Sequence, residues 1–442
     1  MDAAAAARDG QTALALRLAK HLAPPPATAG GADDDDASAR GCGNGNVAFS
    51  PVSVHAALAL VAAGARGATL AQLLAFLGAP SAEVLADFSR RVADRVLADR
   101  SDAGGPRVLF GGGIWVDASR GGLADAFRDV AADVQKSEAR TVSFAKEPEA
   151  AVKMINEWVK KATANLIGSI ISVDDINGDV DLVLANAVYF KGAWQSPFIT
   201  YETWTGAFHR LDGVVTKPMF MTGFKDLNVA CMDGFKVVKL PYEPGAAPAS
   251  QQRKRRRGRG AASKSKATPS APEVDEGTRY SMFVFLPDAP GCLSTMVDMV
   301  TASPAFLYGV LAEMKTRRVK IKLPQFEISF SWSDLKRDLS RLGLSLPFSR
   351  EAADLRGICE VVDDDAAASA RRPTFLSKVA HMAVVKVNEA GTDAAAVTAA
   401  LYGGGRPPDT VEFTADHPFT FFIMEELSGV IVFAGHVLDP TK

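Results

Sequence analysis

Apolar residues recur at helical spacing in the first half of the chain. Residues 53–78 predict one helix, a break at Gly64 and Gly67, and a second helix. Residues 149–163 predict a further helix, because their apolar positions fall three or four residues apart. These positions are Val152, Ile155, Trp158 and Val159.

Nearly continuous apolar runs predict strands, which are more frequent in the second half. Residues 181–190 ("DLVLANAVYF") suit a strand buried on both faces. Gly111, Gly112 and Gly113 are interpreted as small residues in or near a strand. Further strands are predicted at residues 236–242, 280–287, 319–330, 419–425 and 429–437. Helices concentrated early and strands late indicate an α+β protein with large sheets.

Three segments lack apolar periodicity and are predicted to be loops or insertions, namely residues 24–45, 244–277 and 362–373. The second contains a basic run, Arg253 to Arg259, that could address nucleic acid or a nuclear import receptor. No aromatic residues are interleaved with this run, which weakens a base-stacking role. We therefore interpret it as a solvated insertion, and nucleic acid is not an expected partner.

Composition narrows the class of protein. Of 442 residues, 48% are hydrophobic and the formal net charge is −2, which is typical of a globular protein and argues against one that coats nucleic acid or anionic membranes. The four cysteines are far apart in sequence, so we interpret them as free thiols in a reducing compartment. The N-terminal segment has no signal-peptide pattern, and a cytoplasmic or nucleocytoplasmic location is expected.

The sequence contains no recognisable catalytic motif. It has no G-x-S-x-G, no H-E-x-x-H and no P-loop, and its six histidines are scattered without a visible triad partner. The aspartate runs lack the spacing of a calcium loop. We therefore expect no enzymatic activity, no cofactor and no metal site.

Several blocks, taken in their order along the chain, are far more specific than any one of them. They include "NVAFSPVSVHAALAL" from Asn46, "INEWVKKATANLI", "LANAVYFKGAWQSPF", "LSKVAHMAVVKVNEAGTDAAA" and "FTADHPFTFFIMEELSGVIVFAGHVLDP". This ordered set resembles the serpin family, and the sequences of several blocks are close to those of plant serpins of the Z type. The C-terminal signature of the family is met at Asp416–Phe419, whereas Thr420 stands where a hydrophobic residue is usual.

The resemblance implies a single domain over residues 1–442 with three β-sheets, about nine helices and an exposed reactive-centre loop at residues 389–413. In this family a serine protease cleaves the loop, which then inserts into the main sheet and traps the acyl-enzyme. By resemblance, the region where the sheet opens maps to Ser50, Ser53, Asn186, Trp194 and His381. The hinge of the loop maps to Glu389, Gly391, Thr392, Ala394, Ala395 and Ala396.

The loop sequence is compatible with insertion. If Thr392 points inward, strand alternation directs Ala394, Ala396, Thr398, Ala400 and Tyr402 inward and puts the charged Asp393 on the solvent face. Insertion forms on the order of ten backbone hydrogen bonds at about 1 kcal/mol net each. The uninserted fold is then expected to be metastable and protected by a kinetic barrier.

Counting from both ends of the loop places the reactive bond at Gly405–Arg406. Gly405 offers no side chain to a specificity pocket, and a cut after Arg406 is disfavoured because Pro407 follows it. The hinge departs from the family pattern at Ala390 and Val397, and Met382 replaces the lysine that usually follows the histidine.

Two functions remain open at this point. The first is inhibition of a serine endopeptidase, or alternatively a cysteine endopeptidase, by a monomer that needs no membrane. The second is a non-inhibitory serpin that acts as a binding or scaffold protein. They differ in whether loop cleavage yields a trapped covalent complex.

Overall fold

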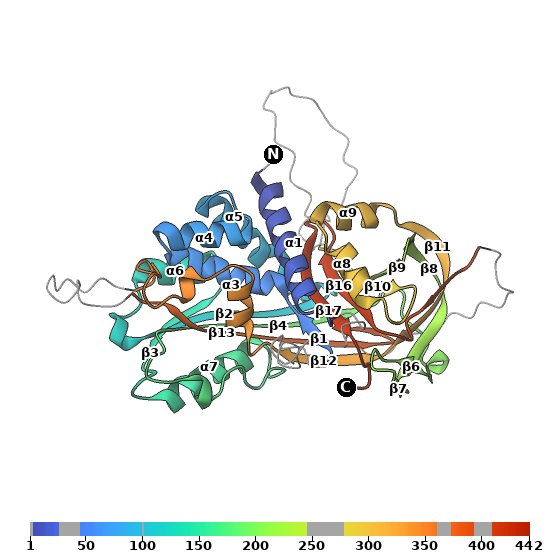
Figure 1. Cartoon of the computed structure of the whole chain (residues 1–442). Helices are drawn as coiled ribbons and strands as arrows, with labels where there is room; N and C mark the ends of the chain where they lie inside the picture. Colours follow the sequence, from blue (N-terminus) through green and yellow to red (C-terminus); the bar gives the residue numbers. More distant parts are fainter. Residues whose placement is uncertain (1–2, 26–44, 100, 245–277, 360–372, 393–408) are drawn as a thin grey trace, which may run out of the picture.

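The computed structural model describes residues 3–25, 45–99, 101–244, 278–359, 373–392 and 409–442. This part of the chain contains nine α-helices and three β-sheets (Figure 1). The helices are α1 (Ala3–His21), α3 (Pro51–Gly64), α4 (Gly67–Leu77), α5 (Ala82–Arg91), α6 (Asp125–Asp133), α7 (Pro148–Ala162), α8 (Leu293–Val300), α9 (Pro304–Ala312) and α10 (Leu335–Arg341). The expected fold class, α+β with three sheets and about nine helices, is confirmed.

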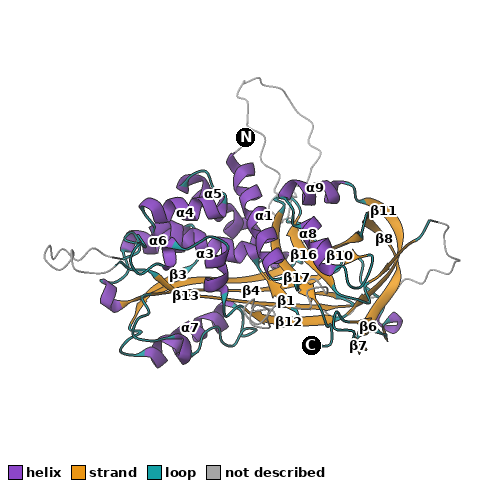
Figure 2. Ribbon diagram, viewed as in Figure 1, coloured by secondary structure: helices purple, strands orange, loops and turns teal. Residues whose placement is uncertain are grey.

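A six-stranded sheet forms the long axis of the molecule. Its order is β12 (Phe326–Ser331), β13 (Leu376–Asn388), β14 (Gly391–Thr392), β4 (Leu182–Ala193), β2 (Arg107–Asp117) and β3 (Glu138–Val142). Figure 2 shows helices α3 to α6 on one side of this sheet and α7 on the other. Because both faces are covered, β4 is buried at every position from Leu182 to Phe190, as its apolar run predicts.

The second sheet has nine strands. Its order is β1 (Val47–Phe49), β17 (Val430–Val437), β16 (Phe419–Glu425), β10 (Tyr280–Pro287), β9 (Phe235–Pro241), β8 (Met219–Met232), β11 (Lys315–Pro324) and β15 (Val411–Thr414), with β5 (Trp204–Thr205) also paired to β8. A two-stranded sheet joins β6 (Phe208–His209) to β7 (Val215–Thr216). The second sheet ends at β15, the strand that follows the predicted reactive loop in sequence.

Helix α3 packs against both large sheets, through contacts with β17, β4 and β2. The Ser50 side chain accepts a hydrogen bond from the backbone N–H of Ser53, and Pro51 occupies the first turn, where its missing N–H costs nothing. Every residue of the helix except Ala63 is buried. The helix ends at Gly64, where an added Cβ atom would lie 2.2 Å from the Ile358 side chain.

The predicted elements agree with the structure, with two differences. The apolar stretch at 319–330 is divided at Gln325 into β11 and β12, which belong to different sheets. Strands β1 to β4 also lie early in the chain, and helices α8 to α10 lie late, so helices and strands are less segregated than expected. The predicted loops lie largely outside the described residues, and a single domain over 1–442 stays a prediction.

The described ranges also show how the chain stands against the requirements of a membrane-spanning helix, a metal site and a disulfide. No single helix there is long and apolar enough to cross a membrane, and two bent helix pairs meet that length and composition only when taken together. Within the same ranges, no group of three or more His, Cys, Asp or Glu side chains is placed to hold a metal ion. Cys231, Cys292 and Cys359 are free thiols, whereas Cys42 lies outside the described residues.

Candidate functional site: a hinge seated between two strands

The predicted hinge begins as a strand within the six-stranded sheet. After β13 ends, the chain turns back, and β14 pairs antiparallel with both of its neighbours, β13 and β4. Thr392 lies opposite Val387 of β13 and Gly192 of β4. The turn is formed locally, because the Asn388 side-chain oxygen accepts hydrogen bonds from the backbone N–H groups of Ala390 (3.0 Å) and Gly391 (3.2 Å).

Gly391 occupies a backbone position that other residues cannot adopt without strain. Its φ is +147°, and an added Cβ atom would lie 2.0 Å from the carbonyl oxygen of Gly192. The two backbones approach this closely because neither residue has a side chain. Glycine is therefore required at this position of the predicted hinge, where β14 begins.

The side chain of Thr392 is fully buried beneath two aromatic rings. Its hydroxyl lies 2.7 Å from the Tyr242 hydroxyl, and the Tyr242 ring stacks on Trp194 at a centroid distance of 4.5 Å. The Trp194 indole N–H donates to the carbonyl of Asn388 at 3.0 Å, and its backbone N–H donates to the carbonyl of Ala390 at 2.9 Å. Burial raises the pKa of Tyr242, so the phenol stays protonated and able to donate. These contacts hold the hinge in place.

Lys225 supports the same region from β8. Its ammonium group donates to the carbonyls of Ser196 (2.6 Å) and Pro197 (2.7 Å), just after Trp194 in the chain. Burial lowers the pKa of Lys225 to about 8. The next residue, Phe198, donates its backbone N–H to the carbonyl of Glu389 at 2.8 Å. The segment after β4 is thus fixed to both β8 and the hinge.

A buried polar network joins β13, β4 and α3 deeper in the sheet. The His381 Nε2 accepts the backbone N–H of Ser50 at 3.1 Å, so the ring proton resides on Nδ1, which donates to the Asn186 side-chain oxygen. The same oxygen accepts the Ser53 hydroxyl at 2.5 Å. Desolvation lowers the pKa of His381 to about 3, which keeps the imidazole neutral.

The network lies six residues below the hinge on each strand, or about 20 Å along them. His381 pairs with Asn186 in the parallel ladder of β13 and β4, and this ladder runs from Leu376 to Val384 of β13. At the top, Val387 and Gly192 are separated by β14. The two strands are therefore joined over most of their length and parted only where the hinge enters.

The structure separates the predicted site residues into three groups. Ser50, Ser53, Asn186 and His381 meet in the buried network, and their proposed part in sheet opening remains a prediction. Trp194 lies with the hinge residues Glu389, Gly391 and Thr392. The third group, Ala394, Ala395, Ala396, Gly405 and Arg406, lies outside the described residues.

Sequence reasoning did not identify Tyr242 or Lys225. Tyr242 ends the predicted strand at 236–242, and nothing in that strand pattern signals a contact with the hinge 150 residues later. Lys225 becomes noticeable only in the structure, because a lysine buried within a strand is rare unless its charge is satisfied.

Thr420 departs from the family signature for a reason that the structure shows. Its hydroxyl donates to the Nδ1 of His436 at 2.9 Å, and the Nε2 of His436 donates to the carbonyl of Ala19 at 2.9 Å. Burial lowers the pKa of His436 to about 4. A neutral imidazole has one donor and one acceptor nitrogen, which matches these two partners. Thr420 therefore completes a buried hydrogen-bond chain to α1.

Comparison with known proteins gives consistent results. The sequence model of the family described as "Serpin (serine protease inhibitor)" matches residues 36–250 and 272–440. The chain is 44% identical to putative serpin-Z5 of rice, Oryza sativa subsp. japonica, over 98% of this chain and 90% of that protein. The structure superposes on Arabidopsis AtSerpin1 in its native stressed conformation with a TM-score of 0.78 and 31% identity over the full length of both chains. Human thyroxine-binding globulin complexed with its ligand has the same fold, with a TM-score of 0.74 and 20% identity over 100% of each chain.

Proposed function

Because the chain belongs to the serpin family, and within it to the plant Z-type serpins, we propose that it inhibits an endopeptidase through cleavage of its 389–413 loop and insertion of that loop into the six-stranded sheet. The observation that carries this proposal is β14, a strand already paired on both sides at the point where insertion begins. A linker with no role in the sheet would not need to pair with two of its strands. A cytoplasmic or nucleocytoplasmic monomer stays a prediction.

The length of the loop supports this proposal when the β14 register is continued along its two neighbours. Each further residue descends one position on both neighbours, so Thr398 arrives level with His381 and Asn186. Tyr402 arrives level with Leu182, where β4 begins, and Gly405 follows just beyond. The segment that can pair with both neighbours thus stops near the first residues of β4 and β13, close to the predicted reactive bond.

Insertion replaces the hydrogen-bonded ladder between β13 and β4 with two ladders, one on each side of the inserted strand. The direct pairing between β13 and β4 is lost, and the new strand forms hydrogen bonds on both sides. The net gain of one ladder is on the order of ten bonds at about 1 kcal/mol each. That free energy is available to displace a covalently attached protease faster than the acyl bond hydrolyses.

The test is to mix the purified protein with trypsin-like, chymotrypsin-like and elastase-like serine proteases and with a papain-like cysteine protease. We expect a denaturing gel to show a stable adduct with at least one of them. Mass spectrometry of the released C-terminal fragment then identifies the bond, with Gly405–Arg406 expected. Cleavage within the loop by every enzyme, without an adduct, would contradict the inhibitor proposal.

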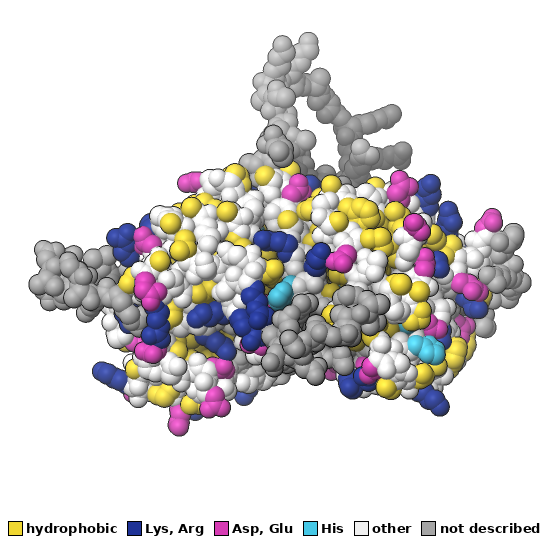
Figure 3. All heavy atoms as spheres, in the orientation of Figure 1, with side chains coloured by type: hydrophobic (Ala, Val, Ile, Leu, Met, Phe, Trp, Pro, Cys, Tyr) yellow, Lys and Arg dark blue, Asp and Glu magenta, His cyan; other side chains and the backbone are white. Residues whose placement is uncertain are grey.

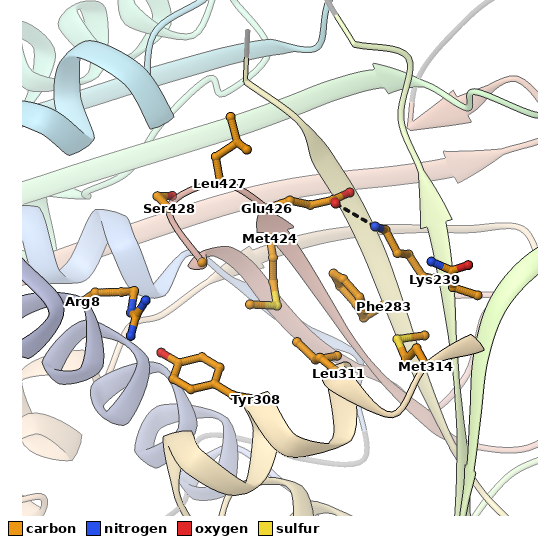
Figure 4. A pocket seen from close by; sticks show the side chains of 12 residues that line it. Arg8, Lys239, Phe283, Tyr308, Leu311, Met314, Met424, Glu426, Leu427 and Ser428 are labelled. Carbon is orange, nitrogen blue, oxygen red and sulfur yellow. Dashed lines mark hydrogen bonds and ion pairs between the residues drawn. The ribbon is translucent and has the colours of Figure 1, made fainter. Parts of the chain in front are cut away.

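A second candidate function, ligand binding without inhibition, is favoured by one pocket. A cavity of about 340 Å³ lies between α1, α9 and the second sheet (Figure 4). Its apolar lining includes Phe283, Leu311 and Met424. Arg8 and Lys239 also line it, and each is paired with a carboxylate: Arg8 with Asp9 at 3.0 Å and Lys239 with Glu426 at 2.7 Å. This lining suits a small molecule with an apolar ring and a polar group that contacts one of these ion pairs. Thyroxine-binding globulin, which carries a ligand on the same fold, supports the compatibility of the fold with such a role.

This second candidate is tested by titration with 8-anilinonaphthalene-1-sulfonate, an aromatic anion whose fluorescence rises in apolar sites. We expect saturable binding, weakened about tenfold in an Arg8→Ala/Lys239→Ala variant because both substitutions remove side chains that line the cavity. Lys236→Ala removes a cation from the same strand that pairs with Asp288 away from the cavity, and serves as the control. Equal binding by all three proteins would exclude this pocket.

A further inference from the structure

Exposed aromatic side chains gather around the first half of β8 in the second sheet. Within the described residues, four Phe, Tyr or Trp side chains are exposed, and three of them lie here: Tyr201 (67%), Trp204 (50%) and Phe224 (48%). The fourth, Phe306, lies on α9. Monomeric proteins rarely cluster large apolar side chains on the surface without a binding role.

Two local features place these three residues along the first half of β8. Strand β5 pairs with β8 so that Trp204 lies opposite Phe220, four residues from Phe224 on the same strand face. Between them, the Thr222 hydroxyl donates to the carbonyl of Glu202 at 2.7 Å, which anchors the turn bearing Tyr201 against the middle of β8. We call Tyr201, Trp204 and Phe224 the aromatic ridge.

Cations from β11 flank the aromatic ridge on the same sheet face. The Lys322 ammonium lies 5.2 Å from the centre of the Trp204 ring, and the Arg318 guanidinium lies 5.9 Å from the centre of the Phe224 ring. Lys320 pairs directly opposite Phe224 in the ladder. Arg318 also pairs with Asp226 at 3.3 Å, and Lys320 pairs with Glu412 at 3.7 Å. Acidic and basic side chains are likewise interspersed over the visible face of the molecule (Figure 3). Aromatic residues together with arginine are typical of the energetic centres of protein–protein interfaces.

The aromatic ridge lies two strands away from β15, the strand in which the predicted loop ends. Glu412 of β15 pairs with Lys320 of β11, and Lys320 pairs with Phe224 of β8. Two strand spacings therefore separate Glu412 from Phe224, a distance of about 10 Å. Arg406 is six residues before Glu412, a span of at most about 20 Å even when fully extended. A protease catalytic domain is about 40 Å across, so an enzyme holding this loop reaches the aromatic ridge.

We propose that the aromatic ridge is a second docking surface for the target endopeptidase, contacting apolar side chains on the rim of its active-site cleft. The inference rests on the proposed function and explains how a loop with glycine before its reactive bond can select an enzyme. A glycine fills no specificity pocket, so the binding free energy that discriminates between proteases must come from another surface. The aromatic ridge supplies that surface within reach of the bond.

The experiment compares the full-length protein with a Tyr201→Ala/Trp204→Ala/Phe224→Ala variant. The enzyme is the one, from the serine-protease panel, that reacts fastest at residues 393–408 of the parent. We expect the second-order rate constant for loop reaction to fall by about tenfold or more, whether the product is an adduct or a cleaved chain. Adduct formation reports on the inhibitor proposal, and the rate ratio reports on the aromatic ridge, so the two can fail separately.

Two further variants keep the result interpretable. Phe306→Ala removes the exposed aromatic that, among the described residues, lies outside the aromatic ridge, and this variant is expected to react at the parental rate. Tyr201→Ala/Phe224→Ala leaves Trp204 in place beside Phe220 and preserves local packing, and it is expected to retain a clear rate loss. Parental rates in both aromatic-ridge variants would overturn the proposal.

Discussion

Gly391→Ala is expected to convert the protein from an inhibitor toward a substrate. The substituted residue must adopt a φ of +147°, and its Cβ atom would lie 2.0 Å from the Gly192 carbonyl oxygen, so β14 cannot keep its seat. Such a backbone position costs on the order of 1–3 kcal/mol for a non-glycine residue, before the clash is relieved. Insertion then starts late relative to hydrolysis of the acyl-enzyme, and we expect the trapped fraction to fall about tenfold.

Two measurements check this result. Densitometry of a denaturing gel gives the ratio of adduct to cleaved chain. Hydrogen–deuterium exchange, followed on the peptide containing residues 388–392, reports whether the β14 amides are still protected before any protease is added. Gly168→Ala is the control, because a Cβ atom there meets nothing within 4 Å. An unchanged adduct ratio together with unchanged protection would contradict the claim that Gly391 is needed to hold β14 between β13 and β4.

Acid is expected to destabilise the native sheet through His381. Its pKa is about 3 in the folded chain and about 6.5 when exposed, so the unfolded chain binds more protons between these values. Stability is therefore fully present above about pH 6.5 and is lost progressively as the pH falls toward 3. At about pH 4.5 the loss from His381 alone is roughly 2–3 kcal/mol. The physical cause is that burial removes water from the charged imidazole, and protonation of its Nε2 also turns an N–H toward the Ser50 N–H.

The measurement is the urea concentration at which the native state is lost, at about pH 7.5 and at about pH 4.5. His381→Gln replaces the imidazole with an amide that can both donate and accept but does not titrate, and it is expected to reduce the difference between the two pH values. His55 and His436, whose pKa values burial lowers to about 4, leave a residual difference. The exposed His209, changed to Gln, is expected to behave as the parent. A parental pH difference in His381→Gln would rule out this contribution.

Part of the candidate site could be predicted from sequence because its signals are local. The glycine at the hinge and the small residues that follow it are visible in the sequence and imply a strand able to enter a packed sheet. Ser50 and Ser53 begin a recognisable helix, and the family resemblance draws attention to Asn186 and His381. The hydrogen bonds that join Ser50 and Ser53 to Asn186 and His381 span up to 331 positions of the chain, and no local pattern encodes them.

The sequence by itself indicated the family, the strands and helices, the glycine of the hinge and the absence of a side chain before the predicted reactive bond. Periodicity and ordered motifs suffice for these, because each depends on residues close together in the chain. The tertiary structure alone decided that Gly391 lies against the Gly192 carbonyl, that Tyr242 hydrogen-bonds to Thr392 and stacks on Trp194, and that Tyr201, Trp204 and Phe224 are exposed along β8, two strands from β15. Such contacts arise only when strands distant in sequence pair, since pairing register then fixes which side chains meet.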